Sequence, residues 1–161
     1  MRAFTLISDF ARRFPPKLMA QTMEPKSTTC TILADRHLAL VEGIRDLLET
    51  AFQSVYLVSD TSTLCDGAQR LLPALIVLDL SLAGYDSAAV LREISDLSPA
   101  TRILVLTVYD EPSVARMAIG AGAHGVVIKR CIGSDFMPAI DALLRGREYV
   151  SPDFGPGASL H

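Results

Sequence analysis

The feature that constrains this chain most is the run at residues 74–80, which reads ALIVLDL. Its apolar members are mostly Leu, Ile and Val, and it carries one carboxylate, that of Asp79, near its carboxyl end. A strand that is buried on both faces has this composition, and such strands belong to parallel sheets. Because ligands of open parallel sheets bind beyond the carboxyl ends of the strands, Asp79 lies where chemistry is expected. The run alone is equally consistent with an ordinary strand-end aspartate that caps the next turn.

Short apolar runs alternate with helical patterns from residue 31 onward. Five strand-helix units in succession predict a parallel sheet with right-handed crossovers and helices on both faces. We therefore expect an α/β fold, a doubly wound five-stranded sheet of the flavodoxin-like type with strand order 2-1-3-4-5. The predicted strands are 31–34, 55–58, 75–79, 103–107 and 125–128, and the predicted helices are 38–51, 61–72, 87–97, 111–121 and 134–146.

Two segments flank this pattern. Residues 1–29 hold one short apolar run, which Ser8 and Asp9 interrupt before it reaches the length of a signal peptide. We favour a leader that is flexible or peripheral to the fold; a short amphipathic arm and a true start at Met23 are the alternatives. The segment 151–161 is rich in Gly, Pro and Ser and is expected to be a flexible tail, the start of a linker.

Composition excludes several classes of function. The formal net charge is −3, so we expect no nucleic-acid binding through this segment. No apolar stretch approaches the length of a membrane span, and we expect no membrane contact. The three cysteines are widely spaced and predict neither a disulfide framework nor a zinc site, which favours a reduced, cytoplasmic compartment. The glycines at 120–125 follow a helix and precede a strand, so they indicate a tight turn and not a phosphate-binding loop.

Polar residues end four of the predicted strands. Asp35 follows the first strand, Asp79 ends the third, Thr107 ends the fourth and Lys129 follows the fifth. Because the carboxyl ends of parallel strands meet at one edge of the sheet, we expect these side chains to converge on one crevice. Two carboxylates, a hydroxyl and an ammonium suit phosphoryl transfer, with one carboxylate as nucleophile and the other helping to hold a divalent cation.

Five segments carry a family resemblance that covers residues 30–150. They are ILADRH at 32–37 with VEG at 41–43, LDLSLAGYD at 78–86, VLT at 105–107, AGAHGVVIK at 121–129 and GREYVSP at 146–152. Their order and spacing resemble those of the receiver domain of two-component response regulators, in particular the LuxR/NarL-type branch. The resemblance implies a CheY-like fold. It also implies that the chain ends near the linker to an output domain that the sequence does not contain.

The resemblance implies a role for each matching residue. Asp79 would be the phosphoacceptor, taking a phosphoryl group from a phosphohistidine of a sensor histidine kinase or phosphotransfer protein. Lys129 would pair with the phosphoryl oxygens and Thr107 would move to hydrogen-bond them. Mg²⁺ would be held by Asp35, Asp79 and the backbone carbonyl of Ser81. Such a domain signals through partner or dimer contacts and is not an enzyme with turnover.

The sequence departs from the family pattern at two of the functional positions. Arg36 replaces the second acidic residue after the first strand, which weakens a Mg²⁺ site that needs oxygen ligands. We expect the Arg36 guanidinium to point inward and pair with Asp79; the alternative is that it extends into solvent. Val126 stands where the family has an aromatic switch residue, so no ring is available there. His37 and His124 flank the crevice and are interpreted as structural.

Three functions remain open at the level of sequence. The leading hypothesis is a phosphorelay receiver that is phosphorylated on Asp79. The second is an atypical receiver that acts without phosphorylation because Arg36 replaces a metal-binding acid. The third, and least favoured, is a small α/β phosphatase or hydrolase with Asp79 as its nucleophile.

Overall fold

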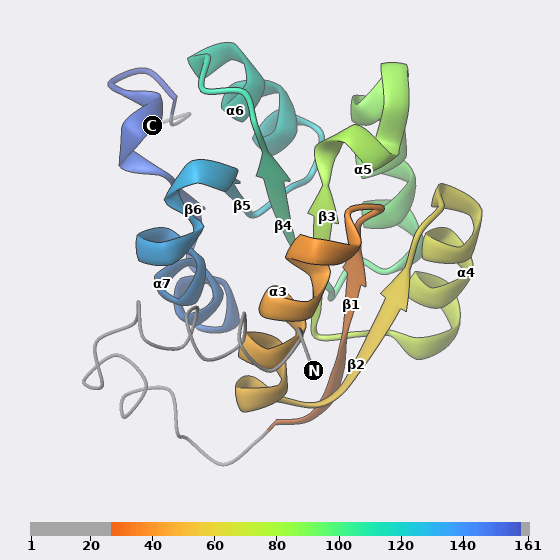
Figure 1. The fold of residues 1–161 in the computed structure, drawn as a ribbon. Coiled ribbons are helices and arrows are strands. Elements are labelled where there is room, and N and C mark those ends of the chain that lie inside the picture. The colour runs from red at the N-terminus through yellow and green to blue at the C-terminus, as the bar shows by residue number, and fades with distance from the viewer. Residues whose placement is uncertain (1–26, 159–161) are drawn as a thin grey trace.

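A parallel sheet with helices on both faces forms the described part of the protein (Figure 1). The structure is a computed structural model that describes residues 27–158. The strand order is β2-β1-β3-β4-β5-β6, so the flavodoxin-like arrangement predicted from the sequence is confirmed and a short sixth strand is added. The elements are β1 (Ser27–Ala34), α3 (Leu38–Ala51), β2 (Phe52–Val58), α4 (Thr61–Leu71), β3 (Leu75–Asp79), the 3₁₀ helix η1 (Leu80–Asp86), α5 (Ser87–Leu97), β4 (Arg102–Thr107), α6 (Pro112–Gly120), β5 (Gly125–Ile128), the 3₁₀ helix η2 (Lys129–Cys131), α7 (Ile132–Leu144), β6 (Tyr149–Val150) and the 3₁₀ helix η3 (Pro152–Phe154).

The sheet separates two apolar cores. Successive side chains of a strand point to opposite faces, so Ile76 and Leu78 of β3 pack with α4, α5 and α6, while Leu75 and Val77 pack with α3 and α7. Every residue of β3 is buried. The unbroken apolar run identified in the sequence is therefore a central strand, between β1 and β4.

Element boundaries differ from the predictions mainly at strand starts. β1 begins at Ser27 and β2 at Phe52, directly after α3, because both strands pair in parallel from their first residues. The predicted leader, apart from the residues that enter β1, lies outside the described residues. β5 is followed by a turn of 3₁₀ helix before α7 begins, so that helix starts two residues earlier than predicted.

The segment after α7 is packed against the domain through residue 158, whereas its composition predicts a flexible tail at 151–161. Gly146, at φ +78°, turns the chain so that β6 runs parallel to β5. Beyond β6, the side chains of Phe154 and Ala158 are each only 2% exposed. Burial of these two apolar side chains favours docking of the segment, and composition alone does not reveal that burial.

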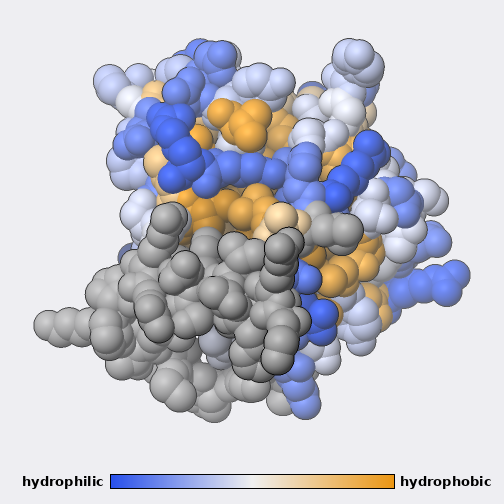
Figure 2. Space-filling view, viewed as in Figure 1, coloured by the Kyte–Doolittle hydropathy of each residue, from blue (hydrophilic) through white to orange (hydrophobic). Residues whose placement is uncertain are grey.

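The surface is of mixed polarity on the face seen in Figure 2. Hydrophilic residues form a band between areas of hydrophobic residues on the coloured part of that face. Within residues 27–158, no helix combines the length and the apolar character needed to cross a membrane.

Candidate functional site

Three strands bring two acids and a lysine together at the carboxyl edge of the sheet. Asp35 follows β1, Asp79 ends β3 and Lys129 follows β5. The Lys129 Nζ lies 3.3 Å from Asp35 Oδ2 and 3.2 Å from Asp79 Oδ1. The two aspartates are 5% and 2% exposed, so the ammonium is the charge that compensates them in a site with little solvent. The convergence predicted for these three residues is observed.

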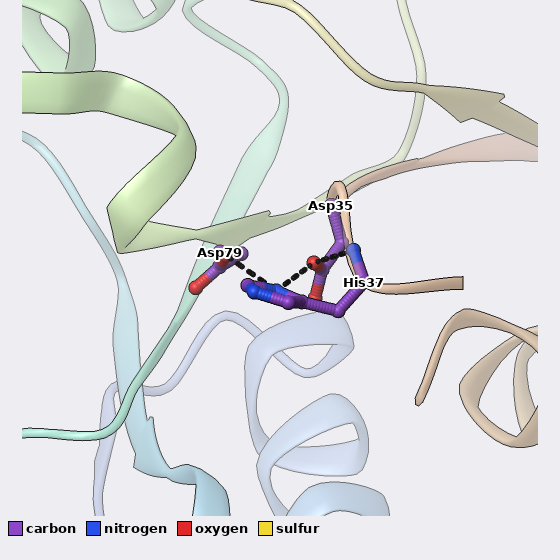
Figure 3. A group of neighbouring side chains, drawn as sticks. All are labelled: Asp35, His37 and Asp79. Carbon is purple, nitrogen blue, oxygen red and sulfur yellow. Dashed lines mark hydrogen bonds and ion pairs between the residues drawn. The ribbon is translucent and has the colours of Figure 1, made fainter. Parts of the chain in front are cut away.

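The His37 ring lies between the same two carboxylates (Figure 3). Its Nδ1 is 2.9 Å from Asp35 Oδ1 and 3.5 Å from Asp79 Oδ2. Its backbone N–H also donates to Asp35 Oδ1, at 2.8 Å, which fixes the turn after β1. Each carboxylate therefore divides its oxygens, with one facing Lys129 and the other facing the imidazole.

Ser81 adds a further hydrogen bond to the Asp79 carboxylate. Its hydroxyl donates to Asp79 Oδ2 at 2.5 Å, and its backbone N–H points to Asp79 Oδ1 at 3.4 Å. These contacts hold the carboxylate over the start of η1. The predicted role of Ser81, a backbone carbonyl ligand to a metal ion, stays a prediction.

Thr107 ends β4 at the same edge of the sheet but, among the described residues, its side chain forms no hydrogen bond with the other site residues. It is 1% exposed, and its Oγ1 accepts a hydrogen bond from the backbone N–H of Tyr109 at 3.1 Å. Val126 is fully buried in β5. At the position where the resemblance implies an aromatic ring, this chain therefore has a valine that is packed in the core.

The inward orientation expected of Arg36 is wrong. Arg36 is exposed, and within the described residues it forms no ion pair with Asp79. It lies on the side of Asp60, whose pKa is held below its usual value by hydrogen bonds from Thr63 and to a smaller extent by the Arg36 charge. The long apolar stem of arginine lets the guanidinium stay in water, and this avoids the cost of burying a second cation beside Lys129.

Comparison with known proteins decides the family. The family model for the response regulator receiver domain matches residues 31–141. The chain belongs to this family. The resemblance to receiver domains seen in the sequence is therefore confirmed at the level of the family.

Curated and solved relatives of this receiver are mostly longer regulators. A probable transcriptional regulatory protein NarL of Mycobacterium tuberculosis is 28% identical over 78% of this chain and 59% of its own length. The fimbriae Z protein of Salmonella typhimurium is 32% identical over 79% of this chain and 60% of its own length. The crystal structure of a LuxR-family response regulator from Aurantimonas superposes with a TM-score of 0.71 at 32% identity, and covers 80% of this chain and 93% of that one. The chain thus spans about 60% of the length of these curated relatives.

The site contains His37, to which the sequence pattern gives a structural role. Its Nδ1 and one oxygen of each aspartate lie within 4.8 Å of one another, close enough to share a metal ion. The signal in the sequence is the spacing Asp35-x-His37 directly after a strand, where a turn returns the third residue toward the first. The structural interpretation holds for His124, whose Nδ1 accepts the backbone N–H of Ile103 at 3.0 Å.

Proposed function

We propose that this receiver accepts a phosphoryl group on Asp79 from a phosphohistidine of a sensor histidine kinase or phosphotransfer protein. The observation that carries the proposal is the placement of Asp79. It is a nearly buried carboxylate at the end of the central strand, with the Lys129 ammonium 3.2 Å away. A carboxylate oxygen attacks phosphorus, the P–N bond breaks, and its electron pair stays on the donor imidazole. The products are an aspartyl phosphate and a free histidine, so the domain is changed by the step and does not turn over.

Lys129 and Thr107 would act on the phosphoryl group itself. The ammonium already bridges both carboxylates and can move to the phosphoryl oxygens as negative charge gathers there. The Thr107 hydroxyl accepts one hydrogen bond from Tyr109 and, among the described residues, its proton has no acceptor. That proton is available to a phosphoryl oxygen if the end of β4 shifts toward Asp79.

The residues present fit a divalent cation only in part. Asp35 and Asp79 supply the carboxylates that Mg²⁺ prefers, but Arg36 removes a third acid from the loop. His37 brings a nitrogen donor instead, and imidazole suits transition ions better than it suits Mg²⁺. We therefore propose weak Mg²⁺ binding by Asp35, Asp79 and the Ser81 carbonyl, with His37 as a ligand when a transition ion is present. The ion would neutralise charge on the transferring group.

Phosphorylation by a small phosphodonor tests the assignment. The protein is incubated with acetyl phosphate and Mg²⁺, and its intact mass is measured before and after base treatment. We expect one base-labile phosphoryl adduct, absent in Asp79→Asn and retained in Asp96→Asn, a control at an exposed aspartate of α5. An adduct that persists in Asp79→Asn would overturn the assignment of the acceptor.

The same assay separates the atypical alternative. A parent protein that takes no phosphoryl group, together with an Arg36→Asp variant that does, would favour a receiver that acts without phosphorylation. Equal labelling of the two proteins would show that position 36 is not decisive. Labelling of the parent that depends on added Mg²⁺ would support the proposed weak site.

The partners of this receiver follow from its surface and its class. The net charge of −3 offers no basic surface to nucleic acid, so we propose that signalling runs through protein contacts, with a kinase, a downstream protein or a second copy of this chain. DNA recognition, where a full-length protein has it, would belong to another segment. Cytoplasmic location stays a prediction.

A further inference from the structure

Residues 149–158 form a strap that closes one edge of the domain. Backbone hydrogen bonds join it to the sheet, from the Tyr149 N–H to the His124 carbonyl at 3.1 Å and from the Ser151 N–H to the Val126 carbonyl at 2.9 Å. β5 would otherwise be an edge strand of the sheet. The strap therefore pairs with β5, the strand that leads directly into Lys129.

The far half of the strap is held by apolar packing over α6. Phe154 and Ala158 are each 2% exposed and belong to the same core cluster as Ala115 and Ala118 of that helix. Arg116, also on α6, donates from Nη1 to the strap's Gly157 carbonyl at 2.8 Å. Burial of this kind marks the strap as a docked element of the domain.

A buried acid outside the phosphoacceptor site holds the middle of the strap. Asp135 of α7 is 8% exposed, and its Oδ2 accepts a hydrogen bond from the Ser151 hydroxyl at 2.5 Å. The same hydroxyl accepts the backbone N–H of Ile128, the residue before Lys129, at 3.2 Å. Burial, and then the Asp135 carboxylate, raise the pKa of Tyr149 to about 12, so that phenol stays neutral beside the acid.

A second link joins the strap to the loop between β4 and α6. Arg130 directly follows Lys129, and its guanidinium pairs with Asp110 of that loop at 3.0 Å and with Asp153 of the strap at 3.6 Å. Asp110 is three residues after Thr107. Both neighbours of Lys129 in the sequence thus contact the strap, and one of them also contacts the loop that Thr107 begins.

We propose that the strap is a conformational device that responds to the phosphoacceptor site, so that a phosphoryl group on Asp79 loosens its docking. The inference rests on the proposed function. A phosphoryl group draws Lys129 and the Thr107 hydroxyl toward it, and Thr107 then releases the Tyr109 N–H. The loop after β4 moves with Thr107 and Asp110 leaves Arg130, so the loop is no longer joined through Arg130 to Asp153 of the strap. Loosening uncovers the apolar side chains of α6 and opens the edge of β5.

Hydrogen exchange on the full chain without any ligand tests the link between loop and strap. Asp110→Asn removes the charge that pairs with Arg130, and Asp96→Asn on α5 is the matched control. Because the three groups of this link are about half exposed, we expect a modest effect, an increase of about two- to fivefold in the exchange rates of the Tyr149 and Ser151 amides. Rates equal to those of the control would overturn the link.

Addition of beryllofluoride and Mg²⁺, which mimic the phosphoryl group, tests the response itself. We expect slower exchange at the Ser81 amide, which reports binding at Asp79, together with faster exchange at Tyr149 and Ser151. Slower exchange at Ser81 with an unchanged strap would overturn the coupling. If the Ser81 amide does not respond, beryllofluoride has not bound and the proposed function fails, while the Asp110→Asn result still decides whether loop and strap are linked.

Discussion

Lys129→Met removes an ammonium that faces both buried carboxylates, and it should destabilise the fold measurably. The lysine side chain is 12% exposed, and the side chains of Asp35 and Asp79 are 0% and 3% exposed, so little water is present to replace the lost charge. In the variant, His37 and Ser81 are the partners that remain to the two aspartates among the described residues. Their mutual repulsion and their desolvation then oppose folding.

The expected magnitude follows from the geometry. Opposite charges about 4 Å apart attract by about 4 kcal/mol at an effective dielectric constant near 20, before desolvation is subtracted. Removal of one partner of a buried ion pair typically costs about 3–5 kcal/mol. His37 faces both carboxylates but is 63% exposed, and it offsets part of the loss. We therefore expect Lys129→Met to lower the free energy of unfolding by about 3 kcal/mol.

Urea unfolding at pH 7, followed by circular dichroism, measures this loss. Asp79→Asn in the Lys129→Met background relieves the repulsion and should restore most of the lost stability, leaving a deficit of about 1 kcal/mol. Lys129→Arg keeps the charge and serves as the matched control. A loss below about 1 kcal/mol in Lys129→Met, or no recovery on adding Asp79→Asn, would refute the view that this lysine compensates both acids.

Three further changes test other parts of the structure. Burial lowers the pKa of His124, whose Nδ1 must be unprotonated to accept the Ile103 N–H. The unfolded chain then binds the proton more readily than the folded protein, so the free energy of unfolding should fall as the pH drops through about 6.5. His124→Gln should reduce this pH dependence in unfolding curves measured from about pH 7.5 to 5.5. A Cβ at Gly125 would lie 2.9–3.1 Å from its nearest neighbours, so Gly125→Ala should lower the free energy of unfolding by about 1–3 kcal/mol. Gly133→Ala is the control, since nothing lies within 4 Å of a Cβ there, and thermal or urea unfolding measures both variants. Phe154→Ala should cost about 3 kcal/mol if the strap is docked in solution, and close to nothing if residues beyond β6 are free.

The fold could be predicted from the sequence because its main signal is local. The β3 run is apolar on both faces, and the helices repeat apolar residues at helical spacing, so element type and order follow from nearest neighbours along the chain. β6 could not be predicted in this way, since two residues carry no periodicity. The burial of Phe154 depends on α6, which lies more than thirty residues earlier, and no pattern within the tail reports that contact.

The site residues at strand ends could be predicted from the sequence. The orientations of the side chains in the turn after β1 could not. Asp35, Asp79 and Lys129 converge because parallel strands end at one edge of a sheet, which is a property of topology. Arg36 and His37 occupy one turn, and the sequence does not specify which of the two faces the carboxylates. The turn after Asp35 is set by the His37 N–H bonding back to the aspartate, and this places the ring over the site while Arg36 extends outward.

Arg36 stands where the family has an acidic residue, and this changes the charge balance around the crevice. The buried crevice contains two carboxylates and one ammonium, so one negative charge remains to attract a further cation. A divalent ion can meet that need, and it would approach the same oxygens that face His37 Nδ1, Asp35 Oδ1 and Asp79 Oδ2. An imidazole that has taken a proton on Nδ1 cannot also ligate a metal through that atom. Within the described residues Arg36 forms no ion pair with Asp79, so the substitution removes an acid from the loop and leaves the proposed acceptor carboxylate with Lys129, His37 and Ser81 as its partners.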